Sequence, residues 1–359
     1  MTYRIAVDVG GTFTDVIAVD EAGRTTFVKA PSTPENQAIG TMDGIERLAM
    51  ALGLSVRHLL GRTERIVHGM TVATNALLER KGARVGLLTT AGHRDVREMR
   101  EGLKPERYNM RLARREPLVP RQLRFGVRER MRADGRIEVP LDRTSLDAAI
   151  ARLKAEEVTS VAVCYLHAYR DPRHERETLE VLEKEMHGVS VSLSSDVLPQ
   201  IKEYERVSTT VVNAYVAPLI ALYLRRLEEG LVEAGFGGPL MIILSHGGVA
   251  PVAEAVRVAA ATVLSGPAGG LAGGRRVAEI LDAPNLITFD VGGTSSDIAL
   301  IAGGSRRCRR TGRWPANVSR CRAWISSRSV PGADRSRASR RAGFSRWDPK
   351  APAPCRGRS

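Results

Sequence analysis

The sequence contains little cysteine and no long uninterrupted apolar run. Outside the last 56 residues only Cys164 is present, within an apolar stretch, which is typical of a buried thiol in a reducing compartment. Cys308 and Cys321 have no C-x-x-C spacing, so a zinc site is not expected. The apolar stretch near the first residue is too short for a signal peptide, and no run of roughly 18 apolar residues predicts a membrane span. We therefore expect a cytoplasmic protein with no membrane partner.

An excess of positive charge is also missing from most of the chain, although the whole sequence carries a net charge of +14. Residues 1–303 contain 38 Lys plus Arg and 38 Asp plus Glu, whereas residues 304–359 contain 16 and 2. The balanced part does not predict a nucleic-acid partner. The last segment has fifteen Arg and neither Leu nor Glu, so it cannot build a core. It is either a basic arm for RNA or an acidic surface, or the product of a reading frame that shifts near Gly304. We favour the shifted frame.

One eight-residue motif is present twice, as DVGGTFTD at 8–15 and as DVGGTSSD at 290–297, each after a short β-branched run. A tight turn with two glycines presents backbone N–H groups to a phosphate. The leading aspartate is placed to hold hydrated Mg²⁺, which prefers carboxylate oxygen and water. Two hairpin turns without a ligand are the alternative. The repetition favours two phosphate-binding turns that close on one nucleotide.

Strands alternate with helices along the rest of the chain. Continuous apolar runs predict buried strands at 84–89 and 159–166, and residues 203–234 predict a long helix interrupted only by Pro218. This alternation predicts an α/β fold with a partly parallel sheet, to which the two hairpins add antiparallel strands. The piece at 103–143, rich in Arg and Pro, is expected to form surface strands and loops whose charges are solvated.

Five longer motifs resemble those of a known protein family. They are HGMTVATNALLERKGA at 68–83, GHRDVREM at 92–99, EPLVPRQLRFGVRERM at 116–131, SLSSDVLPQIKEYERVSTTVVNAYVAP at 192–218 and LSGPAGG at 264–270. The paired Asp-Gly turns resemble those of the actin, sugar-kinase and heat-shock-chaperone ATPases. The longer motifs resemble the hydantoinase A and 5-oxoprolinase family from residue 3 to about 302. The resemblance implies a two-lobed, actin-like (ribonuclease H-like) ATPase fold. Because the family's Gly-rich adenosine segment is missing after Ile301, we expect the second lobe to be incomplete.

The resemblance also implies a domain division and a function. We expect an amino-terminal lobe at 1–190, a partial hydantoinase A domain with the second phosphate turn at 191–303, and an Arg-rich disordered tail at 304–359. The family couples ATP cleavage to the opening of a cyclic amide by phosphorylating its carbonyl oxygen, and relatives serve in acetone or acetophenone carboxylases. The implied cofactors are ATP and Mg²⁺, and the implied partners are a small cyclic amide and a hydantoinase B-type subunit in an oligomer. An inactive, truncated relic is the alternative. A chaperone-like or kinase switch is disfavoured by the motifs between 68 and 218.

Individual residues receive roles from the motifs and the resemblance. Asp8 and Asp290 are predicted to hold the metal and to be catalytic. His68 is predicted to be catalytic and, with Asn75, to face the substrate, although a structural role for His68 is equally open. The residues predicted to bind the nucleotide are Gly10, Gly11, Thr12, Asp15, Gly266, Gly269, Gly292, Gly293, Thr294 and Asp297. Asp15 and Asp297 would orient water or brace the turn. Gly266 stands where the chaperones carry a glutamate, so no general base is assigned.

Overall fold

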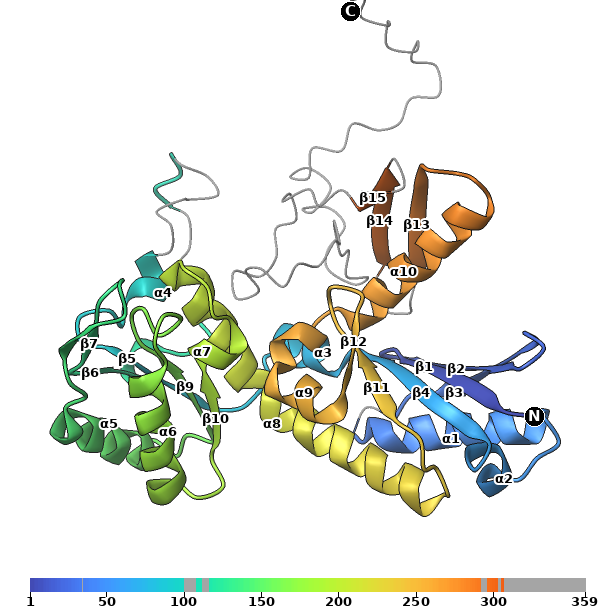
Figure 1. Cartoon of the computed structure of the whole chain (residues 1–359), viewed down its shortest axis with the longest axis horizontal. Coiled ribbons are helices and arrows are strands. Elements are labelled where there is room, and N and C mark those ends of the chain that lie inside the picture. The colour runs from blue at the N-terminus through green and yellow to red at the C-terminus, as the bar shows by residue number, and fades with distance from the viewer. Residues whose placement is uncertain (34, 100–107, 112–115, 292–295, 303–304, 307–359) are drawn as a thin grey trace, which may run out of the picture.

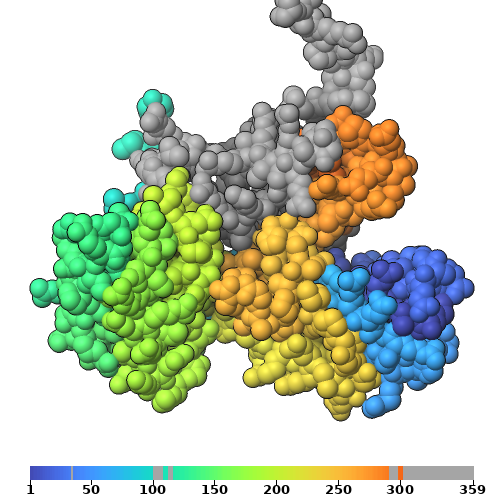
Figure 2. Space-filling view, viewed as in Figure 1, coloured from blue at the N-terminus to red at the C-terminus, as the bar shows by residue number. Residues whose placement is uncertain are grey.

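The computed structural model describes residues 1–33, 35–99, 108–111, 116–291, 296–302 and 305–306. Its elements form two α/β bodies that lie side by side and are bridged by the long helix α8 (Glu203–Glu233) (Figure 1). Figure 2 shows the body of residues 116–200 in green beside the body that carries the amino terminus in blue, with a small orange unit standing above the latter. The α/β class predicted from the alternating pattern is confirmed.

The first body is built on a six-stranded sheet. Its strand order is β12 (Val249–Pro251), β11 (Leu240–Ile243), β4 (Thr63–Met70), β1 (Tyr3–Val9), β2 (Phe13–Asp20) and β3 (Thr25–Pro31). The strands β1, β2 and β3 form an antiparallel meander, whereas β4 runs parallel to β1 and β11 runs parallel to β4. Burial alternates along β1, so Val7 and Val9 face the core and Asp8 faces outward. Helix α1 (Gln37–Ala51) buries Ile45 and Leu48 and packs against β2, β3 and α8.

The second body is built on a four-stranded parallel sheet. Its strand order is β10 (Ser190–Leu193), β9 (Ser160–Cys164), β5 (Val85–Thr90) and β6 (Arg124–Val127). Every residue of β5 and β9 is buried, including the Cys164 thiol, as the continuous apolar runs predict. Helices α5 (Arg143–Ala155) and α6 (Arg173–Glu185) and the first half of α8 pack around this sheet.

The two sheets do not follow the division predicted at 190/191. Strands β11 and β12 come from the second half of the chain, yet they complete the sheet that begins at the amino terminus. Strand β10 straddles the predicted boundary and belongs to the second sheet. The first body is therefore built from two distant segments, and the second body is inserted between them.

Helix α8 is the longest element and is mostly inside the protein. It continues through Pro218 without a break and packs against β9 and β10 with one part and against α1 with another. Its 31 residues, with a mean hydropathy of 1.6 over the most apolar 18-residue window, would suit a membrane span by length and composition alone, but 78% of that window is buried within the protein. The helix therefore has the character of a core helix. It is the one candidate span within the part of the chain that the structure describes.

A small unit follows the first body. Helix α10 (Ser265–Ile280) leads to the hairpin β13 (Leu286–Val291) and β14 (Ser296–Ala302), to which β15 (Ser305–Arg306) adds an edge. Leu271 of α10 packs on Leu286, Ala299 and Ile301 of the hairpin. Gly274 permits this close packing, because a Cβ there would lie 2.4 Å from the Thr288 Cγ2 atom.

The piece at 103–143 differs from the sequence-based expectation. Its described part includes the fully buried Arg124 side chain and the buried Glu129, so not all of its charges are solvated. Residues 103–107 and 112–115 lie outside the described residues. The remaining short elements are α2 (Val56–Leu60), α3 (Val72–Glu79), α4 (Val96–Met99), η1 (Arg121–Leu123), β7 (Arg130–Met131), β8 (Ile137–Val139), α7 (Ser194–Val197), α9 (Val252–Arg257) and η2 (Ala259–Thr262).

Candidate functional site

The first phosphate turn is the hairpin between β1 and β2. Asp8 lies opposite Asp15 in the antiparallel register, and the Gly10 N–H donates to the Phe13 carbonyl at 2.9 Å. A Cβ at Gly10 would lie 3.0 Å from that carbonyl oxygen, so the tight turn favours glycine. Gly11 and Thr12 are exposed at the tip. The predicted turn therefore has the shape and the open backbone that a phosphate requires.

Two hydroxyl residues that the sequence reasoning missed brace this turn. The Ser32 hydroxyl donates to the Gly10 carbonyl at 2.9 Å, and the Ser32 N–H donates to the Thr12 carbonyl at 2.9 Å. From the other side, the Thr71 N–H and hydroxyl both donate to the Val9 carbonyl at 3.1 Å. The tip is thus held in place by contacts from β3 and from the β4–α3 turn. Ser32 stands in no recognised motif, and Thr71 lies in the motif at 68–83, but neither contact can be read from the sequence because it forms only after the chain folds.

Asp8 lies beside two glycines of other elements. A Cβ at Gly69 of β4 would lie 2.9 Å from the Asp8 Oδ1 atom, and a Cβ at Gly266 of α10 would lie 3.1 Å from it. These glycines leave the carboxylate unobstructed. Gly266 was predicted, whereas Gly69 was missed although it lies inside the motif at 68–83.

Hydrogen bonds fix the start of α10 next to this carboxylate. The Ser265 hydroxyl donates to the Met70 carbonyl at 2.8 Å, and the Leu264 N–H donates to the Thr74 hydroxyl at 3.0 Å. Gly269 lies further along the helix, where a Cβ would come 3.3 Å from the Ile243 Cδ1 atom. Its position shows that Gly269 lets α10 pack closely on β11.

The pKa of Asp8 is raised to about 6. Although much of the side chain is open to water, β4 and the start of α10 displace water from one side of the carboxylate, and this burial is the largest cause. The negative charges of Asp290 and of Asp15 add to the shift. Asp290, at the exposed edge of the second hairpin, therefore lies close enough to Asp8 for their charges to interact.

The second hairpin repeats the register of the first. Asp290 lies opposite Asp297, as Asp8 lies opposite Asp15. The predicted ligands Gly292, Gly293 and Thr294 lie outside the described residues. The described backbone shows that both copies of the motif form the same kind of hairpin, with an aspartate leading into each turn.

Two convergent carboxylates suit Mg²⁺. This ion is usually held by one or two carboxylates together with waters and substrate phosphates. Among the described residues there is no group of three or more His, Cys, Asp or Glu that could enclose a metal ion. The pair Asp8 and Asp290 therefore fits an ion that is shared with a nucleotide rather than a closed metal site.

The other predicted residues lie in different surroundings. His68 is on strand β4 and fully buried, with its Nε2 atom 2.6 Å from the Tyr223 hydroxyl. Burial lowers the pKa of His68 to about 3, so the ring is neutral. This position differs from the expectation that His68 faces a substrate, because no surface of the ring is exposed. Asn75 donates to the hydroxyl of Thr71 at 3.2 Å, so it contacts a residue that braces the turn. Asp15 forms an ion pair with Lys29 of β3 at 3.1 Å.

Comparisons with known proteins agree with this arrangement. The family profile described as Hydantoinase/oxoprolinase N-terminal region matches residues 4–186, and that described as Hydantoinase/oxoprolinase matches residues 206–320, which extends beyond the predicted boundary at 303. Caprolactamase subunit alpha of Pseudomonas jessenii is 38% identical over 304 residues, covering 84% of this chain and 44% of the relative. The acetophenone carboxylase gamma subunit of Aromatoleum aromaticum is 35% identical over 317 residues, covering 84% and 43%.

A solved structure extends the likeness to three dimensions. Nucleotide-free acetone carboxylase, an enzyme of ATP-dependent acetone carboxylation, superposes with a TM-score of 0.79 at 30% identity, covering 92% of this chain and 47% of that chain. The chain thus spans less than half the length of these relatives. It has the actin-like fold of ATP-dependent enzymes and belongs to the hydantoinase/oxoprolinase family.

Proposed function

We propose that this chain is the ATP-binding part of an enzyme that activates a carbonyl oxygen by phosphorylation, with a cyclic amide as the substrate. The observation that carries the proposal is the convergence of Asp8 and Asp290 from two hairpins of matching register. The backbone N–H groups of the turns would hold the phosphates, and the two carboxylates would hold Mg²⁺. The ion would neutralise charge on the phosphates.

The proposed chemistry follows from the weak reactivity of the amide. A lactam carbonyl is a poor electrophile, and transfer of the terminal phosphoryl group of ATP to its oxygen turns that oxygen into a leaving group. Water can then add to the carbon, the ring C–N bond breaks and the nitrogen leaves as the amine, and a second water hydrolyses the resulting acyl phosphate. The products are the ring-opened acid, ADP and phosphate. In such a reaction the protein contributes mainly positioning and electrostatic stabilisation. The braced first turn and the unobstructed Asp8 carboxylate supply these two contributions.

The test is ATP-dependent phosphate release with caprolactam, 5-oxoproline or N-methylhydantoin, in the presence of a B-type subunit. Because the chain spans less than half the length of its relatives, a version extended to the full family length is assayed beside it and should be the more active. In the extended protein Asp8→Asn should lower turnover by about two orders of magnitude or more with folding intact, since it withdraws a metal-binding charge. Asp134→Asn, at an exposed turn of the second body, is the matched control. Equal rates for Asp8→Asn and Asp134→Asn would refute the assignment.

A ketone carboxylase subunit is the second candidate. The acetone carboxylase structure covers 92% of the chain with a TM-score of 0.79, and this likeness favours it. The same two turns would then serve to phosphorylate a ketone or bicarbonate. ATP consumption that requires both bicarbonate and acetone or acetophenone, and that no cyclic amide supports, would select this function.

The remaining parts of the proposal concern the cellular setting. We propose a cytoplasmic, oligomeric enzyme with a hydantoinase B-type partner, and the relatives described as subunits support an assembly. An inactive relic is the alternative for the chain as written. The DNA sequence around codon 304 separates these possibilities, because a Gly-rich family sequence in another frame would identify a frameshift.

A further inference from the structure

The carboxyl ends of the second sheet gather polar side chains that have no part in the phosphate turns. All four strands β10, β9, β5 and β6 run parallel, so their carboxyl ends meet at one edge. Helix α8 begins over this edge and packs on β9 and β10. In parallel α/β sheets, ligands bind outside the carboxyl ends of the strands.

Arg206, in the first turns of α8, is the most unusual residue at this edge. Its side chain is almost completely buried, with 1% exposed. Its Nε and Nη1 atoms have no hydrogen-bond partner in the structure. The guanidinium lies over the Tyr169 ring, 5.4 Å from the centroid. A buried cation with unpaired N–H groups is costly, so its retention points to an anion that pairs with it.

Two buried carboxylates of this body, Glu175 and Glu129, are bonded to other groups. Glu175 accepts hydrogen bonds from the Ser194 hydroxyl at 2.6 Å and from the Ser195 N–H at 2.9 Å. Glu129 pairs with the His174 Nδ1 atom at 2.8 Å. Neither carboxylate pairs with Arg206, so its two nitrogen atoms remain available to a ligand.

A second unpartnered group lies beside the same tyrosine. His167 follows β9, its ring packs edge-on to Tyr169 with centroids 6.0 Å apart, and its Nδ1 atom is buried with no hydrogen-bond partner. The φ angle of His167 is 57°, a left-handed conformation that is uncommon for residues other than glycine. Such backbone strain is concentrated at binding sites. Arg206 and His167 therefore bring two unsatisfied polar groups to one aromatic ring.

A further polar group near this cluster is His93, which lies beside Arg130 and near the carboxylates of Glu129 and Glu203. The Arg130 Nη1 atom lies 3.1 Å from the His93 Nε2 atom, and burial together with the Arg130 charge lowers the pKa of His93. Glu203 acts electrostatically on both His93 and Cys164, and Arg206 acts on Cys164. The pair Arg130 and His93 therefore lies near Arg206, at the carboxyl ends of β5 and β9.

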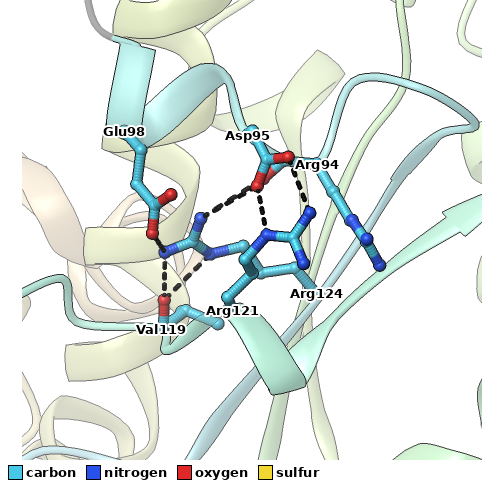
Figure 3. A network of polar contacts seen from close by, with 6 residues as sticks. All are labelled: Arg94, Asp95, Glu98, Val119, Arg121 and Arg124. Atoms are coloured by element: carbon cyan, nitrogen blue, oxygen red, sulfur yellow. Dashed lines mark hydrogen bonds and ion pairs between the residues drawn. The ribbon is translucent and has the colours of Figure 1, made fainter.

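A polar network holds the turn that carries His93 (Figure 3). Arg121 donates to both Asp95 oxygens at 2.9 and 3.0 Å. The buried Arg124 donates twice to the Val119 carbonyl and once to Glu98 at 3.2 Å. These bonds join the motif at 92–99 to the motif at 116–131, so they fix the His93 turn against β6. The turn that carries His93, at the carboxyl ends of the second sheet, is therefore held in place without a ligand.

We propose that Arg206, His167 and Tyr169 form a binding site for a small planar carboxylate at the carboxyl end of the second sheet. The guanidinium fork matches the two oxygens of a carboxylate, and the His167 Nδ1 atom donates to it in the appropriate tautomer. Tyr169 provides an apolar surface beside the ligand. The carboxylate belongs to a substrate such as 5-oxoproline or is bicarbonate, which has the same planar oxygen pair. The identity of the ligand rests on the proposed function, whereas the residues of this site are separate from those of the phosphate turns.

Isothermal titration and thermal denaturation of the full chain test the proposal. The probes are 5-oxoproline, bicarbonate and 2-pyrrolidinone, which has the same ring without the carboxylate. We expect binding of 5-oxoproline or bicarbonate, which identifies the source, and no binding of 2-pyrrolidinone. Arg206→Met should weaken carboxylate binding about tenfold or more, and Arg206→Lys should weaken it less. Arg206→Met should also leave the ligand-free protein as stable or more stable, because it removes a buried unpaired cation.

Two controls separate this site from its surroundings. Arg170 stacks on the same Tyr169 ring at 5.9 Å but is exposed, so Arg170→Ala should bind carboxylates normally. Asp8→Asn should do the same, because it affects only the nucleotide site. Absence of carboxylate binding to the folded wild type, binding of 2-pyrrolidinone equal to that of 5-oxoproline, or unchanged binding by Arg206→Met would overturn the proposal.

Discussion

The carboxylate of Asp8, in the first hairpin, lies close enough to Asp290, in the second, for the negative charge of Asp290 to contribute to the raised pKa of Asp8. Like charges that converge without a cation repel each other. The folded protein therefore holds two negative groups in an arrangement that becomes favourable when a cation joins them.

The first prediction concerns stability against pH. Because the pKa of Asp8 rises from 3.8 to about 6 on folding, the folded state binds a proton more tightly than the unfolded state. Ionisation of Asp8 therefore destabilises the fold as pH increases from 4 to 6, and the full effect persists above 6. Without divalent cations, Asp8→Asn should melt at a higher temperature than the wild type at pH 7. The difference should disappear toward pH 4.

Asp20 provides a control of opposite sign on the same hairpin. Hydrogen bonds from the Arg24 and Ala22 N–H groups and the charge of Arg24 lower the pKa of Asp20 despite a contrary effect of burial. Asp20 therefore stabilises the fold above its unfolded pKa, and this stabilisation is lost as pH falls through its folded pKa. Asp20→Asn should melt at a lower temperature than the wild type at pH 7. Identical pH profiles for the two variants would contradict both assignments.

The second prediction concerns metal linkage. A carboxyl with a pKa of about 6 must lose its proton to bind Mg²⁺, so Mg²⁺–ADP should bind more weakly below pH 6 and should release protons on binding. Calorimetric titration at pH 6 in two buffers of different ionisation enthalpy measures this release. In Asp8→Asn the proton release should vanish. A release of the same size in the variant would assign the titration to another group.

The third prediction uses the glycines of α10. Gly266→Ala should weaken Mg²⁺–ADP binding with little loss of stability, because its Cβ would lie 3.1 Å from the Asp8 carboxylate oxygen while alanine favours the helix. Gly273→Ala lies in the same helix with no atom near its Cβ, so it should stabilise the protein by up to about 1 kcal/mol and leave binding unchanged. Thermal melts and calorimetry on the two variants measure both properties. Equal binding by both would show that Gly266 does not matter to Asp8.

The fourth prediction concerns His68. Tyr223→Phe should leave the buried Nε2 atom without its partner at 2.6 Å, and the Nδ1 atom has none, so the free energy of unfolding should fall by about 1–3 kcal/mol. Urea denaturation measures the loss. Tyr215→Phe, on the same helix, is the control, because the Tyr215 ring packs on Gly82. If Tyr223→Phe proves as stable as Tyr215→Phe, the hydrogen bond contributes little.

Local patterns predicted much of this molecule. The repeated DVGGT segments predicted both hairpins, and the continuous apolar runs predicted β5 and β9, because turns and strand burial are encoded within a few neighbouring residues. Contacts between distant segments were not predictable in this way. Ser32, Thr71 and Gly69 reach the first turn only through the pairing and packing of separate strands.

The same limit explains two differences from expectation. His68 stands in a distinctive motif, but its burial depends on Tyr223, 155 positions away in the sequence. Arginine is usually a surface residue, yet the guanidinium of Arg124 is buried, because its N–H groups donate hydrogen bonds to the Val119 carbonyl and to Glu98. A charged side chain is read as solvated unless its partners are known, and those partners become evident only in three dimensions.

The unbroken passage of α8 through Pro218 restricts how the protein can move. One helix packs on the second sheet and on α1 of the first body, so the two bodies cannot rotate apart without bending it. We therefore expect the motion that admits and releases a nucleotide to occur elsewhere. The glycine-rich helix α10 runs from the Asp8 carboxylate to the second hairpin, and we expect it to act as the hinge. A change in its tilt would change the distance between Asp8 and Asp290.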